Sequence, residues 1–204
     1  MHGYHLVKGK SKHPMEDCLA AEYRQVGEHN LGLFAIFDGH LGHTVADFLR
    51  SHLFDNILSE LVVANVGDSR AVISKNGLAK QLSVDHEPNK ERQSIEEKGG
   101  FVSNIPGDVP RVDGQLAVAR AFGDRSLKKH LSSDPDVVEE AIDKNTEFLI
   151  LASDGLWKVM SNQEAVDEIK DLKDAQAAAK HLTELAVNRK SKDDISCIVV
   201  KFFC

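Results

Sequence analysis

The chain has 204 residues, of which 42% are hydrophobic and 28% are charged. This balance is typical of a folded protein with one domain or at most two small ones, and it argues against disorder. The formal net charge of −7 disfavours non-specific binding to nucleic acid or to an anionic membrane.

The cysteine content and the hydropathy pattern indicate where the protein resides. Cys18, Cys197 and Cys204 show no Cys-x-x-Cys spacing and are odd in number, so we expect a reducing compartment without a disulfide framework. No apolar run approaches the roughly 18 residues that a membrane span needs, and residues 1–12 lack the apolar core of a signal peptide. We therefore expect an intracellular protein, in the cytosol or the nucleus.

The first half of the chain alternates strand-like and helix-like segments. Residues 31–37 (LGLFAIF) form an apolar run that ends at Asp38-Gly39, which predicts a buried strand followed by a turn. Residues 43–59 carry apolar side chains at helical spacing and predict an amphipathic helix. Residues 61–66 predict another buried strand, and residues 71–74 predict a strand that enters a hairpin at Asn76-Gly77.

The second half continues the alternation. A polar helix is expected from Pro88 to Lys98, because proline favours the first helical turn and Gly99-Gly100 would end it. Residues 104–111 contain two prolines and a glycine and predict an exposed loop. Strands are expected at 116–119, 148–152 and 195–202, and helices at 163–170 and 174–189.

The join at Glu60-Leu61 is abrupt. The predicted helix runs directly into a predicted buried strand, with no glycine, proline or asparagine between them. Connections in compact domains usually take about 4–6 residues. Either the helix ends early, near Asp55-Asn56, or a segment is absent at this point.

Acidic residues gather at the ends of the apolar runs. The clusters are Glu16-Asp17, Asp38-Gly39, Asp154-Gly155 and Asp193-Asp194. Carboxylates brought together would repel one another unless a cation neutralised them, and oxygen ligands without a His or Cys pattern favour Mg²⁺ or Mn²⁺ over zinc. An Asp-Gly pair after a strand is more often only a turn, and spacing alone leaves that alternative open.

Eight motifs occur in an order that closely resembles the protein phosphatase 2C family of metal-dependent Ser/Thr phosphatases, and plant members in particular. The motifs are PMEDC (14–18), FAIFDGH (34–40), ANVGDSRAV (64–72), DHEP (85–88), GGFV (99–102), PRVDGQLAVARAFGD (110–124), LASDGLWKVM (151–160) and SKDDISCIVV (191–200). The resemblance covers nearly the whole chain. It implies an α+β fold in which two antiparallel sheets form a β-sandwich flanked by α-helices, in α-β-β-α layers, with a two-ion Mg²⁺ or Mn²⁺ centre at one end.

The resemblance also implies roles for individual acidic residues. Asp38 is expected to bridge both ions and the Gly39 carbonyl to bind one of them. Asp154 and Asp193 are expected to bind the other ion; Asp193 is preferred to its neighbour Asp194, because relatives usually carry Asn at the latter position. The remaining acidic pair, Glu16 and Asp17, is expected to hold waters of the ions.

Other residues follow from the resemblance with an open alternative for each. His40 is expected to be the general acid, or else to cap the following helix, and Lys12 to bind phosphate, or else to belong to a solvated basic patch. Asp85 matches a residue of a third ion site, which we expect to be weak because Lys158 replaces its partner carboxylate. The remaining motif residues, Asp68, Arg70 and Asp124, are expected to be architectural.

The chain departs from the family pattern in its length. Relatives carry a further helix and strand between the equivalents of Glu60 and Leu61, so about fifty residues are expected to be missing from a single catalytic domain over residues 1–204. The missing strand would remove a ladder partner and could expose a sheet edge.

Three functions are compatible with these observations. The first is dephosphorylation of phosphoserine and phosphothreonine in proteins by a monomer that also interacts with kinases. The second is a catalytically impaired phosphatase-like protein that acts as a binding or regulatory module, which the shortened chain and Lys12 favour. The third, hydrolysis of small phosphoesters or of nucleic acid, ranks last because no basic or aromatic surface is indicated.

Overall fold

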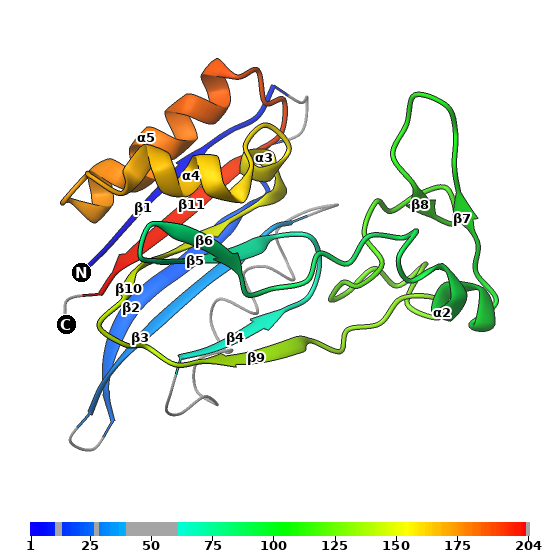
Figure 1. Cartoon of the computed structure of the whole chain (residues 1–204). Coiled ribbons are helices and arrows are strands. Elements are labelled where there is room, and N and C mark those ends of the chain that lie inside the picture. The colour runs from blue at the N-terminus through cyan, green and yellow to red at the C-terminus, as the bar shows by residue number, and fades with distance from the viewer. Residues whose placement is uncertain (11–13, 27–28, 40–60, 203–204) are drawn as a thin grey trace. The chain divides into compact units, whose positions relative to one another are not determined.

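The computed structural model describes residues 1–10, 14–26, 29–39 and 61–202 (Figure 1). The chain divides into two compact units. The first comprises Met1–Val63, Ser69–Leu82 and Val138–Cys204, and the second comprises Ala64–Asp68 and Ser83–Val137. Each unit is described by itself.

A five-stranded antiparallel sheet forms the centre of the first unit. Its strands lie in the order β1-β11-β10-β5-β6 (Figure 1). Their bounds are β1 His2–Val7, β5 Arg70–Lys75, β6 Leu78–Gln81, β10 Thr146–Ala152 and β11 Ile195–Lys201. β5 and β6 form the predicted hairpin, with Asn76 at φ 50° and Gly77 at φ 74°, as the tight turn preferred by Asn-Gly requires.

The alternation of side chains along β10 divides the core of this unit into two layers. Phe148 and Ile150 pack with buried residues of the helices. Leu149 and the partly buried Leu151 point to the other face, where they join Ile198 and a second set of apolar side chains. Both faces of the central sheet are therefore covered, which explains why five of the seven residues in β10 and five of the seven in β11 are apolar.

In the described part of the first unit, three helices contact the central sheet. They are α3 (Asp154–Trp157) against β10 and β11, α4 (Asn162–Ile169) against β6, and α5 (Ala175–Asn188) against β1 and β11 (Figure 1). Ser161 begins α4 with a capping box to Glu164, and the Asp174 carboxylate accepts a hydrogen bond from the Ala177 N–H at the start of α5. Among the described residues, no helix is long and apolar enough to cross a membrane.

The other face of the central sheet contacts a hairpin made of β2 (Cys18–Val26) and β3 (His29–Phe37). Leu19, Phe34 and Ile36 of this hairpin pack into the second core layer. β4 (Leu61–Asn65) pairs with β9 (Asp136–Glu140) as a separate two-stranded sheet rather than extending β2 and β3. In the described part of the chain, β2 is thus the only ladder partner of β3.

The second unit has a small core of its own. It contains α2 (Arg92–Glu97) and a short sheet of β7 (Val102–Ser103) and β8 (Arg111–Val112). Its buried apolar residues are Ile95, Val102, Val112, Ala119, Leu127 and Leu131.

His86 is a buried polar residue of the second unit, with 1% of its surface exposed. Its Nδ1 accepts a hydrogen bond from the Gly67 N–H, so the ring proton lies on Nε2. Nε2 contacts Asp136 Oδ2 at 3.1 Å.

The structure confirms most of the elements expected from the sequence, including antiparallel sheets flanked by helices. The strands expected at 31–37, 71–74, 148–152 and 195–202 and the helices at 163–170 and 174–189 are present within one or two residues at most ends. Residues 104–109 are exposed and lie in the predicted loop. The amphipathic helix expected at 43–59 lies outside the described residues.

Three expectations were wrong in detail. The helix expected from Pro88 begins at Arg92, because residues 88–90 form a turn in which the N–H groups of Lys90 and Glu91 donate to the Glu87 carbonyl. Residues 116–119 are not a strand, since the chain reverses after β8 and leaves a single bridge between Val112 and Leu116. β4 is not buried as expected: Val63 is its only buried residue.

Candidate functional site

Strand register brings the acidic clusters of the first unit to the ends of paired strands. In the hairpin, Cys18 at the start of β2 lies opposite Phe37 at the end of β3, so Asp17 and Asp38 leave at the same end. In the central sheet, Ala152 at the end of β10 lies opposite Cys197 near the start of β11. Asp154, which follows β10, and Asp193, which precedes β11, therefore lie beyond the same end of these two strands. The antiparallel ladders therefore collect carboxylates from segments far apart in the sequence.

Close contacts join the hairpin end to the end of the central sheet. The Ser196 hydroxyl of β11 donates a 2.7 Å hydrogen bond to Asp17 Oδ2. A Cβ added to Gly39 would lie 2.3 Å from the Glu16 carbonyl oxygen, and one added to Gly9 would lie 2.3 Å from the Asp193 carbonyl carbon. These approaches require glycine, and they fix the segments that carry Glu16, Asp38 and Asp193 against their neighbours.

Two carboxylates form the centre of this acidic end. Asp38 and Asp154 each offer a carboxylate oxygen, and these oxygens lie within 4.8 Å of each other. The Asp38 side chain follows β3 and is exposed, whereas Asp154 is the first residue of α3 and its side chain is 18% exposed. Oxygens at this separation can belong to one small cation or to two adjacent ones.

Asp17 is a buried carboxyl group at the same end, with 7% of its surface exposed. Burial away from water is the main cause that raises the pKa of Asp17, to about 6. Hydrogen bonds from Ser196 and Ser153 act in the opposite direction, and the nearby charges of Asp194 and Asp154 raise the pKa further. A cation in this environment would remove the cost of ionising Asp17.

Asp193 and Asp194 have different surroundings. The Asp194 residue is 4% exposed, and its carboxylate accepts hydrogen bonds from the Gly9 N–H and, at 3.1 Å, from the Glu16 N–H. The Asp193 side chain is 41% exposed and does not take part in those backbone contacts. Asp194 thus ties the segments after β1 and before β2 to the start of β11, while Asp193 remains accessible to a ligand.

Lys158 supplies positive charge to the acidic end. It follows α3 as the C-cap residue, four positions after Asp154. Its ammonium contacts Asp154 Oδ2, and it donates a 2.7 Å hydrogen bond to Asp193 Oδ2. Burial by itself lowers the pKa of Lys158, but the charge of Asp154 and the hydrogen bonds to both carboxylates outweigh it, so the pKa lies above its ordinary value and the side chain is a cation.

Several expected site residues are not brought together here. Lys12 and His40 lie outside the described residues. Asp85 belongs to the second unit, so its part in a third ion site stays a prediction. Asp68, which was expected to be architectural, is also in the second unit, and that expectation stays a prediction.

The residues expected to be architectural have contacts of that kind. Arg70 donates a 2.6 Å hydrogen bond to Asn162 Oδ1 and lies over the Trp157 ring, 5.2 Å from its centroid. Asp124 accepts a hydrogen bond from Ser126 in a turn. These contacts stabilise local structure.

Sequence reasoning missed Ser196 and Ser153, which donate to Asp17. Both residues are fully buried, and Ser196 lies in a strand whose seven residues are all buried. A hydroxyl in such an apolar strand needs a hydrogen-bond partner, which was the available signal.

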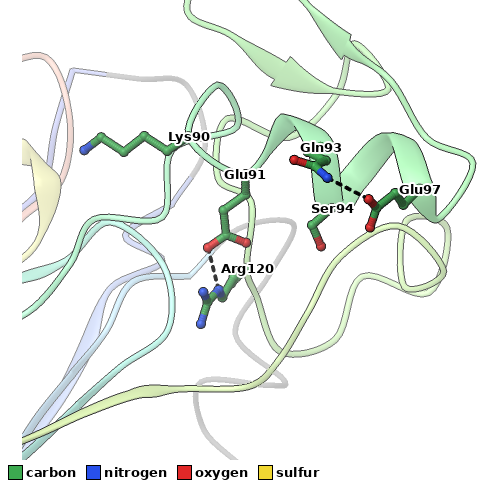
Figure 2. A pocket seen from close by; sticks show the side chains of 6 residues that line it. All are labelled: Lys90, Glu91, Gln93, Ser94, Glu97 and Arg120. Carbon is green, nitrogen blue, oxygen red and sulfur yellow. Dashed lines mark hydrogen bonds and ion pairs between the residues drawn. The ribbon is translucent and has the colours of Figure 1, made fainter.

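The second unit contains an open, polar hollow. It is lined by Lys90, Glu91, Gln93, Ser94, Glu97 and Arg120 and has a volume of about 360 Å³ (Figure 2). Figure 2 shows the Glu91 carboxylate pointing to Arg120, which it contacts at 2.6 Å, and Gln93 donating to Glu97 at 2.9 Å. Because these groups already pair with each other and the hollow is open and polar, it lacks the apolar walls typical of a small-molecule site.

Comparisons with known proteins identify the family of this chain. The family model "Protein phosphatase 2C" matches residues 55–195. "Probable protein phosphatase 2C 62" of Oryza sativa subsp. japonica is 73% identical over 252 residues, which cover 100% of this chain and 87% of that protein. "Probable protein phosphatase 2C 58" of Arabidopsis thaliana is 60% identical and covers 98% of this chain and 87% of its own length.

A solved structure shares the fold. The serine-threonine phosphatase 2C from Toxoplasma gondii superposes with a TM-score of 0.84 at 21% identity, covering 99% of this chain and 94% of that one. With the sequence matches, this shows that the chain belongs to the protein phosphatase 2C family. It is a metal-dependent protein phosphatase, a hydrolase of serine and threonine phosphoesters.

The different surroundings of Asp193 and Asp194 predict different effects of the same substitution. Asp194→Ala should lower the free energy of unfolding of the metal-free protein by about 2–4 kcal/mol, because two backbone N–H groups lose a charged acceptor. Asp193→Ala should change it by less than about 1 kcal/mol, because water can replace an exposed carboxylate. Urea denaturation in EDTA measures both; an equal loss, or a larger one for Asp193→Ala, would contradict the assignment.

The raised pKa of Asp17 predicts a stability change with pH. Below about pH 4 the carboxyl group is protonated in the folded and the unfolded chain, whereas between pH 4 and about 6 only the folded chain keeps the proton. The metal-free protein therefore loses stability as pH rises through this window, by up to about 3 kcal/mol.

Asp17→Asn removes this ionisation and should stabilise the metal-free protein at pH 7.5 but not at pH 4. Thermal unfolding in EDTA at the two pH values measures the difference from wild type. The control is Asp171→Asn, at an exposed residue, whose effect should be small at both pH values. An Asp17→Asn effect that is the same at pH 4 and pH 7.5 would show that Asp17 does not titrate as described.

Proposed function

We propose that this chain hydrolyses phosphoserine and phosphothreonine in proteins at a pair of Mg²⁺ or Mn²⁺ ions held by the acidic end of the first unit. The observation that carries the proposal is the pair of carboxylate oxygens of Asp38 and Asp154, within 4.8 Å of each other at the ends of separate elements. A centre with two ions rather than one is the finer part of the proposal.

The residues present fit hard divalent cations. The donors available at this end are carboxylate and backbone oxygens, which Mg²⁺ and Mn²⁺ prefer. Asp17 ionises only at an energetic cost, first because it is buried away from water and then because the charges of Asp194 and Asp154 lie nearby. A cation bound at this end would lower that cost.

In this proposal the acidic residues divide two tasks. Asp38 and the Gly39 carbonyl would hold one ion, and Asp38, Asp154 and Asp193 would hold the other. Glu16 and Asp17 orient water by accepting hydrogen bonds. When bound, the ions supply a water activated for attack on phosphorus and neutralise the phosphoryl oxygens.

Two residues outside the described range complete the proposed chemistry. His40 follows Gly39 directly and donates a proton to the departing serine or threonine oxygen, a step that matters because such an alkoxide is a poor leaving group. Lys12 attracts the substrate phosphate through its charge, without the two-point geometry that arginine offers.

The wider setting is also part of the proposal. Phosphoproteins are the substrate class. The physiological partners include the kinases that phosphorylate these proteins, because the enzyme removes the phosphate that they add. We propose a monomer that acts in the cytosol or the nucleus, without binding nucleic acid or membrane.

A catalytically impaired binding module is the second candidate, favoured by one specific observation. The match to the Oryza sativa relative extends over 252 residues, whereas this chain has 204. We propose that the difference reflects a segment absent between Glu60 and Leu61, which would leave β3 without one ladder partner. A folded chain that binds Mn²⁺ and phosphoprotein but shows no turnover would select this candidate.

Asp38→Asn tests the proposed activity. With Mn²⁺ and a phosphothreonine peptide, kcat/KM should fall at least about a hundredfold, because the shared ligand of both ions loses its charge. EDTA should abolish the activity of the wild type. Glu184→Gln is the control, because it also removes one negative charge and the Glu184 side chain lies on α5 and is 57% exposed. Full activity in EDTA, or equal effects of the two substitutions, would exclude the mechanism.

A further inference from the structure

The ammonium of Lys158 lies between two carboxylates from different elements. Asp154 begins α3 and Asp193 precedes β11, and Lys158 Nζ contacts Oδ2 of both. Its position is fixed by the helix, because residues four apart on a helical turn share a face and the Lys158 N–H donates to the Asp154 carbonyl at 2.9 Å. A positive charge is therefore built into the chain where these two carboxylates meet.

The same two carboxylates are the proposed ligands of one ion, and this inference rests on that proposed function. An ion held by Asp154 and Asp193 would lie about 2.1 Å from their oxygens, whereas the ammonium approaches Asp193 at 2.7 Å. Lys158 already contacts Oδ2 of both carboxylates, and a divalent ion on the same two carboxylates would lie close enough to the ammonium for the two positive charges to repel each other, so the two cations compete for this site. Lysine is suited to yield, since its charge lies on a flexible four-carbon stem and this side chain is 51% exposed.

We propose that Lys158 is a tethered counter-cation that competes with the metal ion at Asp154 and Asp193. In the metal-free protein it stabilises the acidic end by pairing with both carboxylates. Binding of that ion requires the ammonium to leave, which weakens the affinity, while the ion on the Asp38 and Gly39 side is not opposed by this contact. The two ions thus bind with unequal affinity, and occupancy of the second responds to the concentration of Mg²⁺ or Mn²⁺.

Lys158→Met separates competition from a purely structural role. Methionine keeps an unbranched stem and removes the charge. The variant should bind Mn²⁺ about tenfold or more tightly at the weaker site, measured by calorimetry and by the electron paramagnetic resonance signal of free Mn²⁺. Its thermal midpoint in EDTA should fall, and the rise of that midpoint on adding Mn²⁺ should exceed that of the wild type.

Lys170→Met is the matched control. Lys170 is the C-cap residue of α4, is 45% exposed and pairs with Asp167 of that helix at 2.9 Å, and its substitution by methionine removes the same charge. It should leave Mn²⁺ affinity within about twofold of the wild type, because a distant exposed charge is screened. Equal tightening in both variants would mean that net charge, not competition at Asp154 and Asp193, controls the affinity, and it would overturn the proposal.

Two other outcomes are decisive. If the wild type binds Mn²⁺ and Lys158→Met binds it no more tightly, the competition is wrong, although the proposed function stands. If Lys158→Met leaves the Mn²⁺ affinity unchanged and raises only the KM for the phosphopeptide, Lys158 contacts the substrate, and the competition is wrong in that case too. If neither protein binds Mn²⁺ while both unfold cooperatively, the proposed metal centre and the competition fail together.

Discussion

Repulsion between carboxylates is the constraint on which the acidic end of the first unit depends. Asp38 and Asp154 present oxygens within 4.8 Å of each other. Burial is the main cause that raises the pKa of Asp17, and the charges of Asp194 and Asp154 raise it further. Like charges at such distances lower the stability of the folded chain unless a cation offsets them. Lys158 offsets part of this repulsion, and divalent ions are proposed to offset the remainder.

The scaffold keeps these groups together through backbone contacts. β3 ends one residue before Asp38 and β10 ends two residues before Asp154, and the antiparallel ladders with β2 and β11 set which strand ends coincide. Asp194 then ties the Gly9 and Glu16 N–H groups to the start of β11. Stability and function are divided between adjacent residues: Asp194 holds the segments in place, and Asp193 remains accessible.

Part of this arrangement could be predicted from the sequence. The apolar runs before Asp38 and Asp154 predicted strands with acidic ends, and the Asn-Gly pair predicted the β5–β6 hairpin, because these are local signals. β1, β2 and β9 were missed. Residues 2–7 contain two histidines and a glycine, and residues 18–26 contain Ala-Ala-Glu, so neither segment shows a clear strand pattern; tertiary pairing decides their conformation.

The contacts of Lys158 were beyond the reach of sequence reasoning. Its position four residues after Asp154 indicated that it would oppose a third ion, but the salt bridge to Asp193 depends on how β11 approaches α3. In the same way, the hydrogen bond from Ser196 to Asp17 joins residues 179 positions apart. Such pairings become visible only once the packing of strands and helices is known.

Anomalous diffraction from crystals of the wild-type protein grown with Mn²⁺ tests the central claim most directly. The account predicts manganese peaks at the acidic end, about 2.1–2.3 Å from carboxylate oxygens of Asp38 and Asp154, with Lys158 Nζ displaced where the second ion is bound. Well-ordered crystals in which both carboxylates are defined and no manganese contacts either of them would contradict it.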